Sequence, residues 1–158
     1  VIMYDLPIIP PKKPSKLLYR KSSAILELER LANIEDRALH PSVDSKYLAP
    51  RKYRDDTANK LTACIVKYIR LCGGFASRVN NTGTYRQKLC RFTPSQSKKG
   101  LPDILATYRG QSLFIDVKVG RDTQSEHQRR VEQAQEQAGG LYYLARDFEK
   151  FKKWFDNL

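Results

Sequence analysis

The sequence predicts an α/β fold: a central mixed four-stranded sheet flanked by helices, in the order α-β-β-β-α-β, preceded by a basic N-terminal arm with one helix. Three observations support this prediction. Residues 57–72 carry apolar side chains at helical spacing. Residues 104–108 and 113–119 are short apolar runs at hairpin distance. Residues 141–145 form a strand after a second helix, and such a crossover makes the last strand parallel to the one before it.

Composition limits the class of protein. A chain of 158 residues is long enough for one domain plus an appendage. We expect an arm with a linker over residues 1–54 and a folded domain over 55–158. The net charge is +12, above the magnitude of about 2–8 common for a small domain, which favours a nucleic-acid partner.

Several classes of protein are disfavoured. The sequence has no apolar run of the ~20 residues needed to cross a bilayer, and we expect neither a membrane partner nor a signal peptide. Three cysteines without a C-x-x-C pair, and only two histidines, argue against a structural zinc site. Unpaired cysteines of this kind suit a reducing compartment.

The N-terminal arm begins with prolines that oppose regular structure, at positions 7, 10, 11 and 14. A helix is expected from Ser22 or Ser23 to about Leu39, where Pro41 ends it. Its incomplete apolar stripe leaves three roles open: packing on the core, pairing with a second copy, or docking another protein. Residues 42–54 are expected to be a linker.

The first core helix is expected to begin after Thr57, which is a suitable N-cap, and to end at Gly73-Gly74. A strand over 75–79 and a turn over 80–83 follow. Residues 84–99 are predicted to be a loop rich in basic residues and without acidic ones. Tyr85 and Phe92 alternate with these charges, a composition that suits phosphate contact together with base stacking.

The two central strands carry charged groups that an apolar strand does not need. Leu113, Ile115, Val117 and Val119 alternate with the other residues, so Asp116 and Lys118 share the opposite face of the strand. Asp103 opens the preceding apolar run over 104–108. A hairpin through residues 109–112 would bring Asp103 back across from Asp116, which places two carboxylates and one lysine at one end of the sheet.

The remaining elements complete the sheet and its cover. Thr123 and Glu126 fit a capping box, and the helix they open is expected to reach about Ala138. A strand over 141–145 follows. Asp147 then caps a closing helix with an aromatic face that we assign to the core, made of Phe148, Phe151, Trp154 and Phe155.

The converging charges fit a metal-assisted phosphodiester cleavage site. Two carboxylates are hard oxygen ligands that suit Mg²⁺, or Mn²⁺ in its place, and a lysine can position the attacking water or stabilise developing charge. The triplet D-x-K occurs twice. Asp44-Ser45-Lys46 has no strand around it, whereas Asp116-Val117-Lys118 is embedded in a strand and follows a Pro-Asp pair at hairpin distance.

These residues resemble a known family. Gly100, Pro102-Asp103 and Asp116-Val117-Lys118 are similar to the motif of the PD-(D/E)xK nuclease superfamily, in its VRR-NUC (virus-type replication-repair nuclease) branch, which is close to the Holliday-junction resolvases. Residues 78–83 resemble its Arg-x-Asn-x-x-Gly stretch, Gln128 stands where the family carries a Gln, and residues 139–143 resemble its closing strand. The resemblance covers roughly residues 55–158.

The resemblance implies a restriction-endonuclease-like core and the activity of a metal-dependent deoxyribonuclease. It further implies an endonuclease that cuts branched, flap or junction DNA in phage or mobile-element replication, recombination or repair. It implies that Asp103, Asp116 and a backbone carbonyl near Val117 bind the metal. Lys118 would assist the water and Gln128 would orient groups at the site. It also makes a homodimer and a location in the cytoplasm of a bacterial or phage-infected cell plausible.

Basic and polar residues upstream of the site are the candidates for nucleic-acid contact, with an exposed, solvated surface as the alternative reading. They are Arg78, Asn80, Arg86, Lys88, Arg91, Lys98 and Lys99. His127 lies beside Gln128, and an exposed histidine without a role is the favoured reading there.

The sequence departs from the family pattern in one helix. Related nucleases carry a glutamate on the first core helix, whereas residues 57–71 contain no acid and Asn59 is the nearest polar candidate. Position 116 also carries Asp where Glu is commoner. A catalytically inactive nucleic-acid-binding module of the same fold is therefore the alternative reading, and a protein-interaction adaptor that uses the N-terminal helix is a weaker third.

Overall fold

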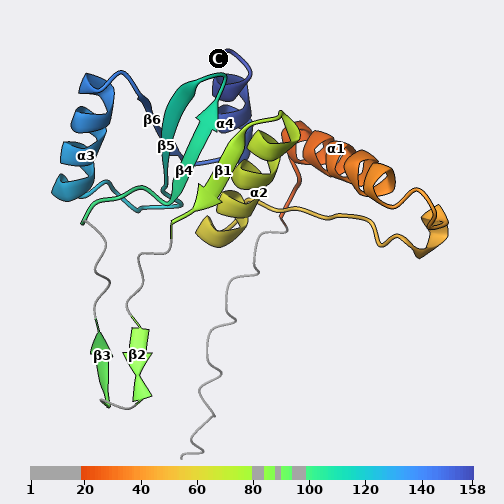
Figure 1. Ribbon diagram of the computed structural model, residues 1–158, viewed down its shortest axis with the longest axis horizontal. Coiled ribbons are helices and arrows are strands. Elements are labelled where there is room, and N and C mark those ends of the chain that lie inside the picture. Colours follow the sequence, from red (N-terminus) through yellow and green to blue (C-terminus); the bar gives the residue numbers. More distant parts are fainter. Residues whose placement is uncertain (1–18, 80–83, 88–89, 94–98) are drawn as a thin grey trace, which may run out of the picture.

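A mixed four-stranded sheet forms the centre of the molecule (Figure 1). The computed structural model describes residues 19–79, 84–87, 90–93 and 99–158. Strands β1 (Phe75–Arg78), β4 (Ile104–Tyr108), β5 (Gln111–Val117) and β6 (Leu141–Ala145) lie in the order β1-β4-β5-β6. The first two contacts are antiparallel and β5 pairs with β6 in parallel, so the predicted α/β fold with a mixed sheet is confirmed.

Helices cover the two faces of this sheet unequally. Helices α1 (Ser23–Leu39), α2 (Ala58–Leu71) and α4 (Phe148–Phe155) lie on one side, and α3 (Glu126–Gln137) lies by itself on the other (Figure 1). The apolar side chains of β5 point toward the first side, where Leu113 and Ile115 are fully buried against α2 and α4. The polar side chains of the same strand therefore face α3.

The helix of the N-terminal arm packs on the core. Ile25, Leu28 and Ala32 of α1 have no exposed surface, and Ile25 and Leu28 belong to the same apolar cluster as α2 and α4. Of the three roles that the sequence left open for this helix, the structure shows the first. The boundary after residue 54 stays a prediction.

The segment after α1 returns along that helix, through the short 3-10 helix η1 (Ser45–Tyr47). The backbone N–H of Arg51 donates to Asn33 Oδ1 at 2.8 Å, and the Arg51 guanidinium donates to Asp36 Oδ1 at 2.8 Å. The predicted linker is thus tied to α1 along part of its length. No described helix is long and apolar enough to span a bilayer.

Two local predictions were wrong. Residues 84–99 were expected to form a loop, but β2 (Thr84–Arg86) and β3 (Arg91–Thr93) pair as a separate two-stranded sheet in the register Thr84↔Thr93. Each strand is a single β-branched, aromatic and basic triplet, too short to show a period in the sequence.

The start of α3 was also misplaced. Its N-cap is Ser125 and not Thr123, because Ser125 accepts from the Gln128 N–H while the Gln128 side chain accepts from the Ser125 N–H. The sequence holds two overlapping S/T-x-x-E/Q patterns, and the second one forms the capping box.

We expect α1 to be an integral part of the fold. Leu28→Ala removes a side chain with no exposed surface and should lower the free energy of unfolding by about 2–5 kcal/mol. Leu26→Ala on the same helix is the control, because Leu26 is 54% exposed and its loss should change stability by about 0.5 kcal/mol or less. Urea denaturation measures both. Equal stability of the two variants would contradict the packing of α1 on the core.

Candidate active site

The candidate active site begins with two aspartates on adjacent strands. The antiparallel register pairs Ile104 with Ile115, so the next step along both strands sets Asp103 opposite Asp116. Residues opposite each other across a sheet project from the same face. Asp103 is held in place by two backbone bonds: its Oδ2 accepts from the Val117 N–H at 2.8 Å, and its carbonyl accepts from the Val79 N–H at 2.8 Å.

Asp116 is fully buried and incompletely paired. Its Oδ1 accepts from the Gln128 Nε2 at 3.0 Å. Its Oδ2 lies 3.2 Å from the Lys118 ammonium but makes no hydrogen bond with any residue that the structure describes. A buried carboxylate oxygen without a hydrogen bond is costly, since its water has been removed and not replaced.

Lys118 is nearly as buried as Asp116. Its side chain is 9% exposed and lies just beyond the end of β5, where its backbone N–H donates to the Ala145 carbonyl at 2.9 Å. A second carboxylate, that of Asp122, lies 3.6 Å from the ammonium but is itself 58% exposed. The ammonium is therefore held at the mouth of the site, between a buried carboxylate and an exposed one.

The surroundings of Asp116 shift the pKa of its carboxyl group. Burial raises the pKa of this carboxyl to about 6; Lys118 lowers it and Asp103 raises it further. Like charges opposite each other on a sheet destabilise it. The site thus stores an unfavourable interaction at neutral pH that a bound cation would relieve.

Gln128 connects this pair to helix α3. Its Oε1 accepts from the Ser125 N–H at 2.9 Å and completes the capping box, while its Nε2 donates to Asp116. Both ends of the amide are therefore engaged, and one side chain fixes both the start of the helix and the orientation of the carboxylate. The structure brings together all four predicted catalytic residues, Asp103, Asp116, Lys118 and Gln128.

The donor set fits a hard divalent cation. Asp103 and Asp116 supply carboxylate oxygens, the hydrogen-bond-free Oδ2 of Asp116 is available as a ligand, and Val117 between the two charged residues offers a carbonyl. Within the described ranges no three residues among His, Cys, Asp and Glu come close enough to hold a metal ion together. A metal here would therefore take its remaining ligands from water and substrate.

The residues expected to contact nucleic acid are placed only in part. Arg78 ends β1, is exposed, and donates to Asn59 Oδ1 at 2.6 Å. Lys99 is exposed and lines a pocket of about 280 Å³ beside His127 and Arg130. Arg86 and Arg91 pair across β2 and β3. The remaining three, Asn80, Lys88 and Lys98, lie outside the described residues.

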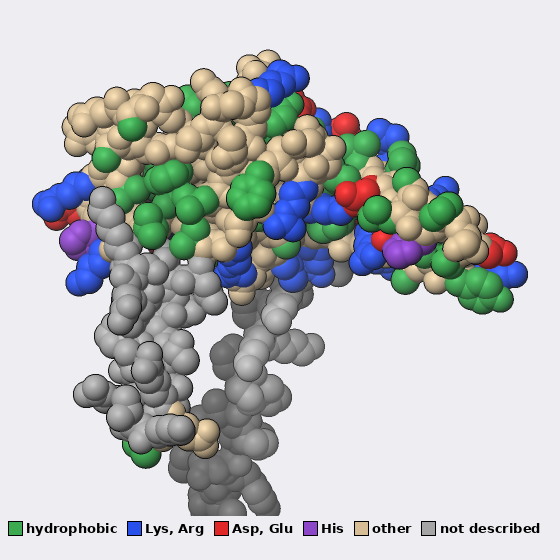
Figure 2. Space-filling view, viewed as in Figure 1, with side chains coloured by type: hydrophobic (Ala, Val, Ile, Leu, Met, Phe, Trp, Pro, Cys, Tyr) green, Lys and Arg blue, Asp and Glu red, His purple; other side chains and the backbone are tan. Residues whose placement is uncertain are grey.

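Figure 2 shows where charge gathers on one face of the molecule. Lys and Arg side chains line its lower edge in this view, the edge from which the chain leads to β2 and β3 (Figures 1 and 2). This distribution agrees with a basic surface near the exposed end of β1, where Arg78 lies.

Three residues of the site were missed by the sequence analysis. Tyr142 lies on β6 and faces the same side as Asp116, while Gln124 and Glu132 come from the α3 side and pair with each other at 2.6 Å. The alternation of Leu141, Tyr142 and Tyr143 along a strand was the available signal for Tyr142. Nothing comparable singles out Gln124 or Glu132 in a helix with many polar residues.

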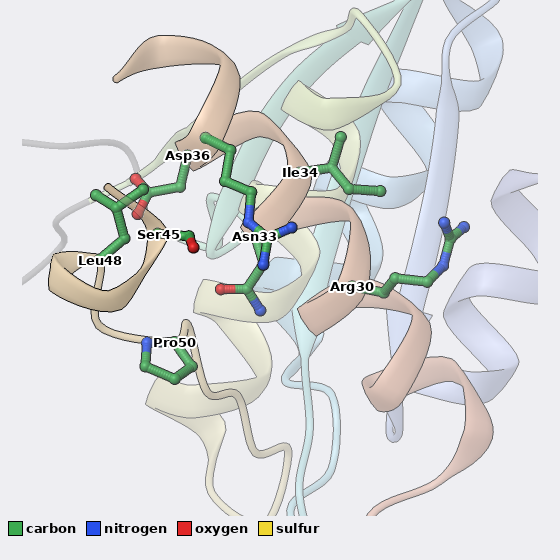
Figure 3. A pocket seen from close by; sticks show the side chains of 8 residues that line it. Arg30, Asn33, Ile34, Asp36, Ser45, Leu48 and Pro50 are labelled. Atoms are coloured by element: carbon green, nitrogen blue, oxygen red, sulfur yellow. The ribbon is translucent and has the colours of Figure 1, made fainter. Parts of the chain in front are cut away.

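A separate pocket of about 390 Å³ lies far from these carboxylates in the fold. It is formed by α1 and the segment that returns along it, with Arg30, Asn33, Ile34, Leu48 and Pro50 among its lining residues (Figure 3). It contains one carboxylate, Asp36, which already binds Arg51. Its chemistry offers no paired acid or nucleophile.

Gly100 sets the distance between the Pro102-Asp103 segment and α3. Its φ is +85°, and a Cβ there would lie 2.5 Å from the backbone carbon and oxygen of His127. Real Cβ atoms do not approach backbone atoms this closely, so the segment meets the first turn of α3 only because position 100 lacks a side chain.

Gly100→Ala should therefore lower the free energy of unfolding by more than the cost of placing an alanine at a positive φ. The matched control is Gly139→Ala, since Gly139 has a φ of +83° with nothing within 4 Å of the added Cβ. We expect a loss of about 1–2 kcal/mol for the control and about 3 kcal/mol or more for Gly100→Ala in chemical denaturation. Equal losses would mean that the close approach to His127 does not constrain the fold.

The buried charge of Asp116 predicts an unusual pH dependence. A carboxyl whose pKa rises from 3.8 to about 6 on folding stabilises the protein below pH 4, and this contribution is lost as the pH rises through 6. Metal-free Asp116→Asn should then exceed the wild type in stability by about 1–3 kcal/mol at pH 7.5. Thermal denaturation from pH 4 to 8 in EDTA would measure this. A difference that does not grow between pH 4 and 6 would contradict the burial cost.

Comparisons with known proteins add one structural likeness. No protein-family model and no curated protein matches the chain. A solved structure described as "VRR_NUC domain" matches with a TM-score of 0.47 and 18% sequence identity, over 63% of this chain and 94% of that chain.

Proposed function

We propose that this protein is a metal-dependent nuclease that hydrolyses phosphodiester bonds in DNA. The observation that carries the proposal is the pairing of Asp103 with Asp116 on adjacent strands, beside a buried Lys118 and with one oxygen of Asp116 lacking a hydrogen bond. A module that only binds nucleic acid gains nothing from two carboxylates facing a phosphate backbone, since they repel it.

The roles follow from the positions of the groups. Asp103, Asp116 and the carbonyl of Val117 would hold Mg²⁺ or Mn²⁺. When bound, this ion activates a water and neutralises charge on the scissile phosphate. The Lys118 ammonium lies 3.2 Å from Asp116 Oδ2 and would donate to the attacking water or stabilise charge in the transition state. Gln128 keeps Asp116 in one orientation.

The charge of the chain favours a polyanionic substrate. With a net charge of +12, the protein attracts nucleic acid over long distances. Arg78 precedes Val79, whose backbone N–H bonds to the Asp103 carbonyl. Lys99 lies in the segment that leads into Asp103, beside His127 and Arg130 of helix α3. We propose that Arg78 and Lys99 contact the phosphates next to the cleaved bond, and that residues 80–98 extend this contact.

The substrate class comes from the family resemblance. We propose an endonuclease on flap, branched or junction DNA, in phage or mobile-element replication, recombination or repair. A homodimer would suit a junction, because a junction offers two equivalent strands to two symmetric sites. In this proposal residues 55–158 form the nuclease domain, and the arm of residues 1–54 supports it through α1.

Cleavage assays test the proposal. Labelled single-stranded, duplex, flap and four-way-junction DNA would be incubated with Mg²⁺, Mn²⁺ or EDTA. We expect metal-dependent cleavage that Asp103→Asn, Asp116→Asn and Lys118→Ala each reduce by about 100-fold or more, because each removes a charge from the reacting centre.

The chain contains its own control for this test. Asp44 and Lys46 form a second D-x-K triplet, with an ion pair of 3.2 Å on an exposed turn. Asp44→Asn and Lys46→Ala change the same residue types away from the site and should leave cleavage unchanged. Equal loss in both triplets would indicate a non-specific effect of charge.

The alternative function is a catalytically inactive DNA-binding module. The absence of an acid from helix α2, where Asn59 instead accepts a hydrogen bond from Arg78, is the observation that favours it. Tight, salt-sensitive DNA binding without cleavage in any metal would establish this module and exclude the nuclease.

A further inference from the structure

Two buried side-chain polar atoms among the described residues make no hydrogen bond, and they lie on the same face of adjacent strands. They are Asp116 Oδ2 and the Tyr142 hydroxyl. The parallel register pairs Phe114 with Tyr142 and Asp116 with Leu144, so Tyr142 is a diagonal neighbour of Asp116. Diagonal neighbours lie roughly 7 Å apart at the backbone, a distance that a tyrosine side chain spans.

Two other polar side chains on this side of the sheet already make hydrogen bonds of their own. Gln124 Nε2 donates to Glu132 Oε2 at 2.6 Å. Gln128 is bonded at both ends of its amide. Asp116 lies near enough to influence the Tyr142 hydroxyl electrostatically, and its Oδ2 keeps unused acceptor capacity.

The two groups are chemically complementary, because a tyrosine hydroxyl can donate a hydrogen bond and a carboxylate oxygen can accept one. Burial, followed by the negative charge of Asp116, raises the pKa of the Tyr142 hydroxyl. A donor and an acceptor that share a face but have no direct hydrogen bond are the two partners that a bridging water requires.

We propose that Tyr142 is a positioning residue of the metal site: its hydroxyl donates to a water molecule that in turn donates to Asp116 Oδ2. This bridge, together with the Gln128 amide on Oδ1, would fix the rotation of the carboxylate toward the cation. The inference rests on the proposed function for the identity of the metal site and adds a residue from β6 to it.

Deletion of the Tyr142 hydroxyl should have different effects if the group only fills space and if it orients a metal ligand. Removal of a buried polar atom without a partner is neutral or stabilising for the fold. Loss of a group that orients a metal ligand costs about 10–100-fold in metal affinity. Tyr142→Phe distinguishes these two roles of the hydroxyl, because it deletes only the oxygen atom.

The experiment compares full-length wild type, Tyr142→Phe and Tyr143→Phe. Tyr143 is the matched control: it neighbours Tyr142 but faces the other side of the sheet, where its ring stacks on Trp154 at 4.3 Å. Thermal denaturation in EDTA gives the metal-free stability, and titration with Mn²⁺ at pH 7.5 gives the concentration for half-maximal stabilisation. Cleavage of the preferred DNA is measured alongside.

We expect Tyr142→Phe to need about 10-fold more Mn²⁺ than the wild type for half-maximal stabilisation. Tyr143→Phe should leave that Mn²⁺ concentration unchanged. An unchanged Mn²⁺ requirement in Tyr142→Phe would overturn the inference, whatever happens to stability. Wild-type protein that Mn²⁺ does not stabilise at all would overturn it as well.

The two proposals fail separately. If the wild type binds Mn²⁺ but cuts no DNA, the nuclease function falls and the titration still decides the role of Tyr142. If the wild type cuts DNA and Tyr142→Phe needs no additional Mn²⁺, the nuclease function stands and the positioning role falls.

Discussion

The antiparallel register of β4 and β5 is the constraint on which the site depends. A shift of one strand by one residue would move Asp103 away from Asp116 and turn the apolar residues of the shifted strand out of the core. The buried set of Ile104, Leu113 and Ile115 thus specifies the register, and the register places the two carboxylates. Packing on one face of the sheet in this way determines electrostatics on the other.

The face of the sheet toward α3 carries an energetically unfavourable buried charge. Asp116 is buried beside a second carboxylate, and Gln128 and Lys118 partly offset its charge. Such an arrangement persists when the remaining core stabilises the fold enough to tolerate it. Here the helices on the far side supply that stability, with three buried phenylalanines from α4 alone, Phe148, Phe151 and Phe155. The division of the molecule into an apolar side and a side that carries buried charges follows from this balance.

Most of the fold could be predicted from the sequence, because the apolar residues follow a clear helical or strand spacing and because capping residues, Gly and Pro mark the ends of several elements. Alternation along residues 113–119 correctly placed Asp116 and Lys118 on one face. Gln128 came only from family resemblance, since one glutamine among many in a polar helix has no distinguishing pattern. The capping box of α3 was misplaced by two residues because two patterns overlap, and tertiary contact with Asp116 favours the second. Tyr142 was missed because every side chain from Leu141 to Leu144 is only partly buried, so alternation alone does not show which face carries a function.

The shared use of Gln128 has a consequence for the energy landscape of the protein. The same amide closes the first turn of α3 and restrains Asp116, so fraying of that turn and rotation of the carboxylate are a single event. Anything that favours the orientation in which Asp116 bonds to Gln128 also lowers the population of the frayed helix end. The orientation of the buried carboxylate and the order of one helix end are therefore thermodynamically linked, although Asp116 and the capping segment lie on different elements of the chain.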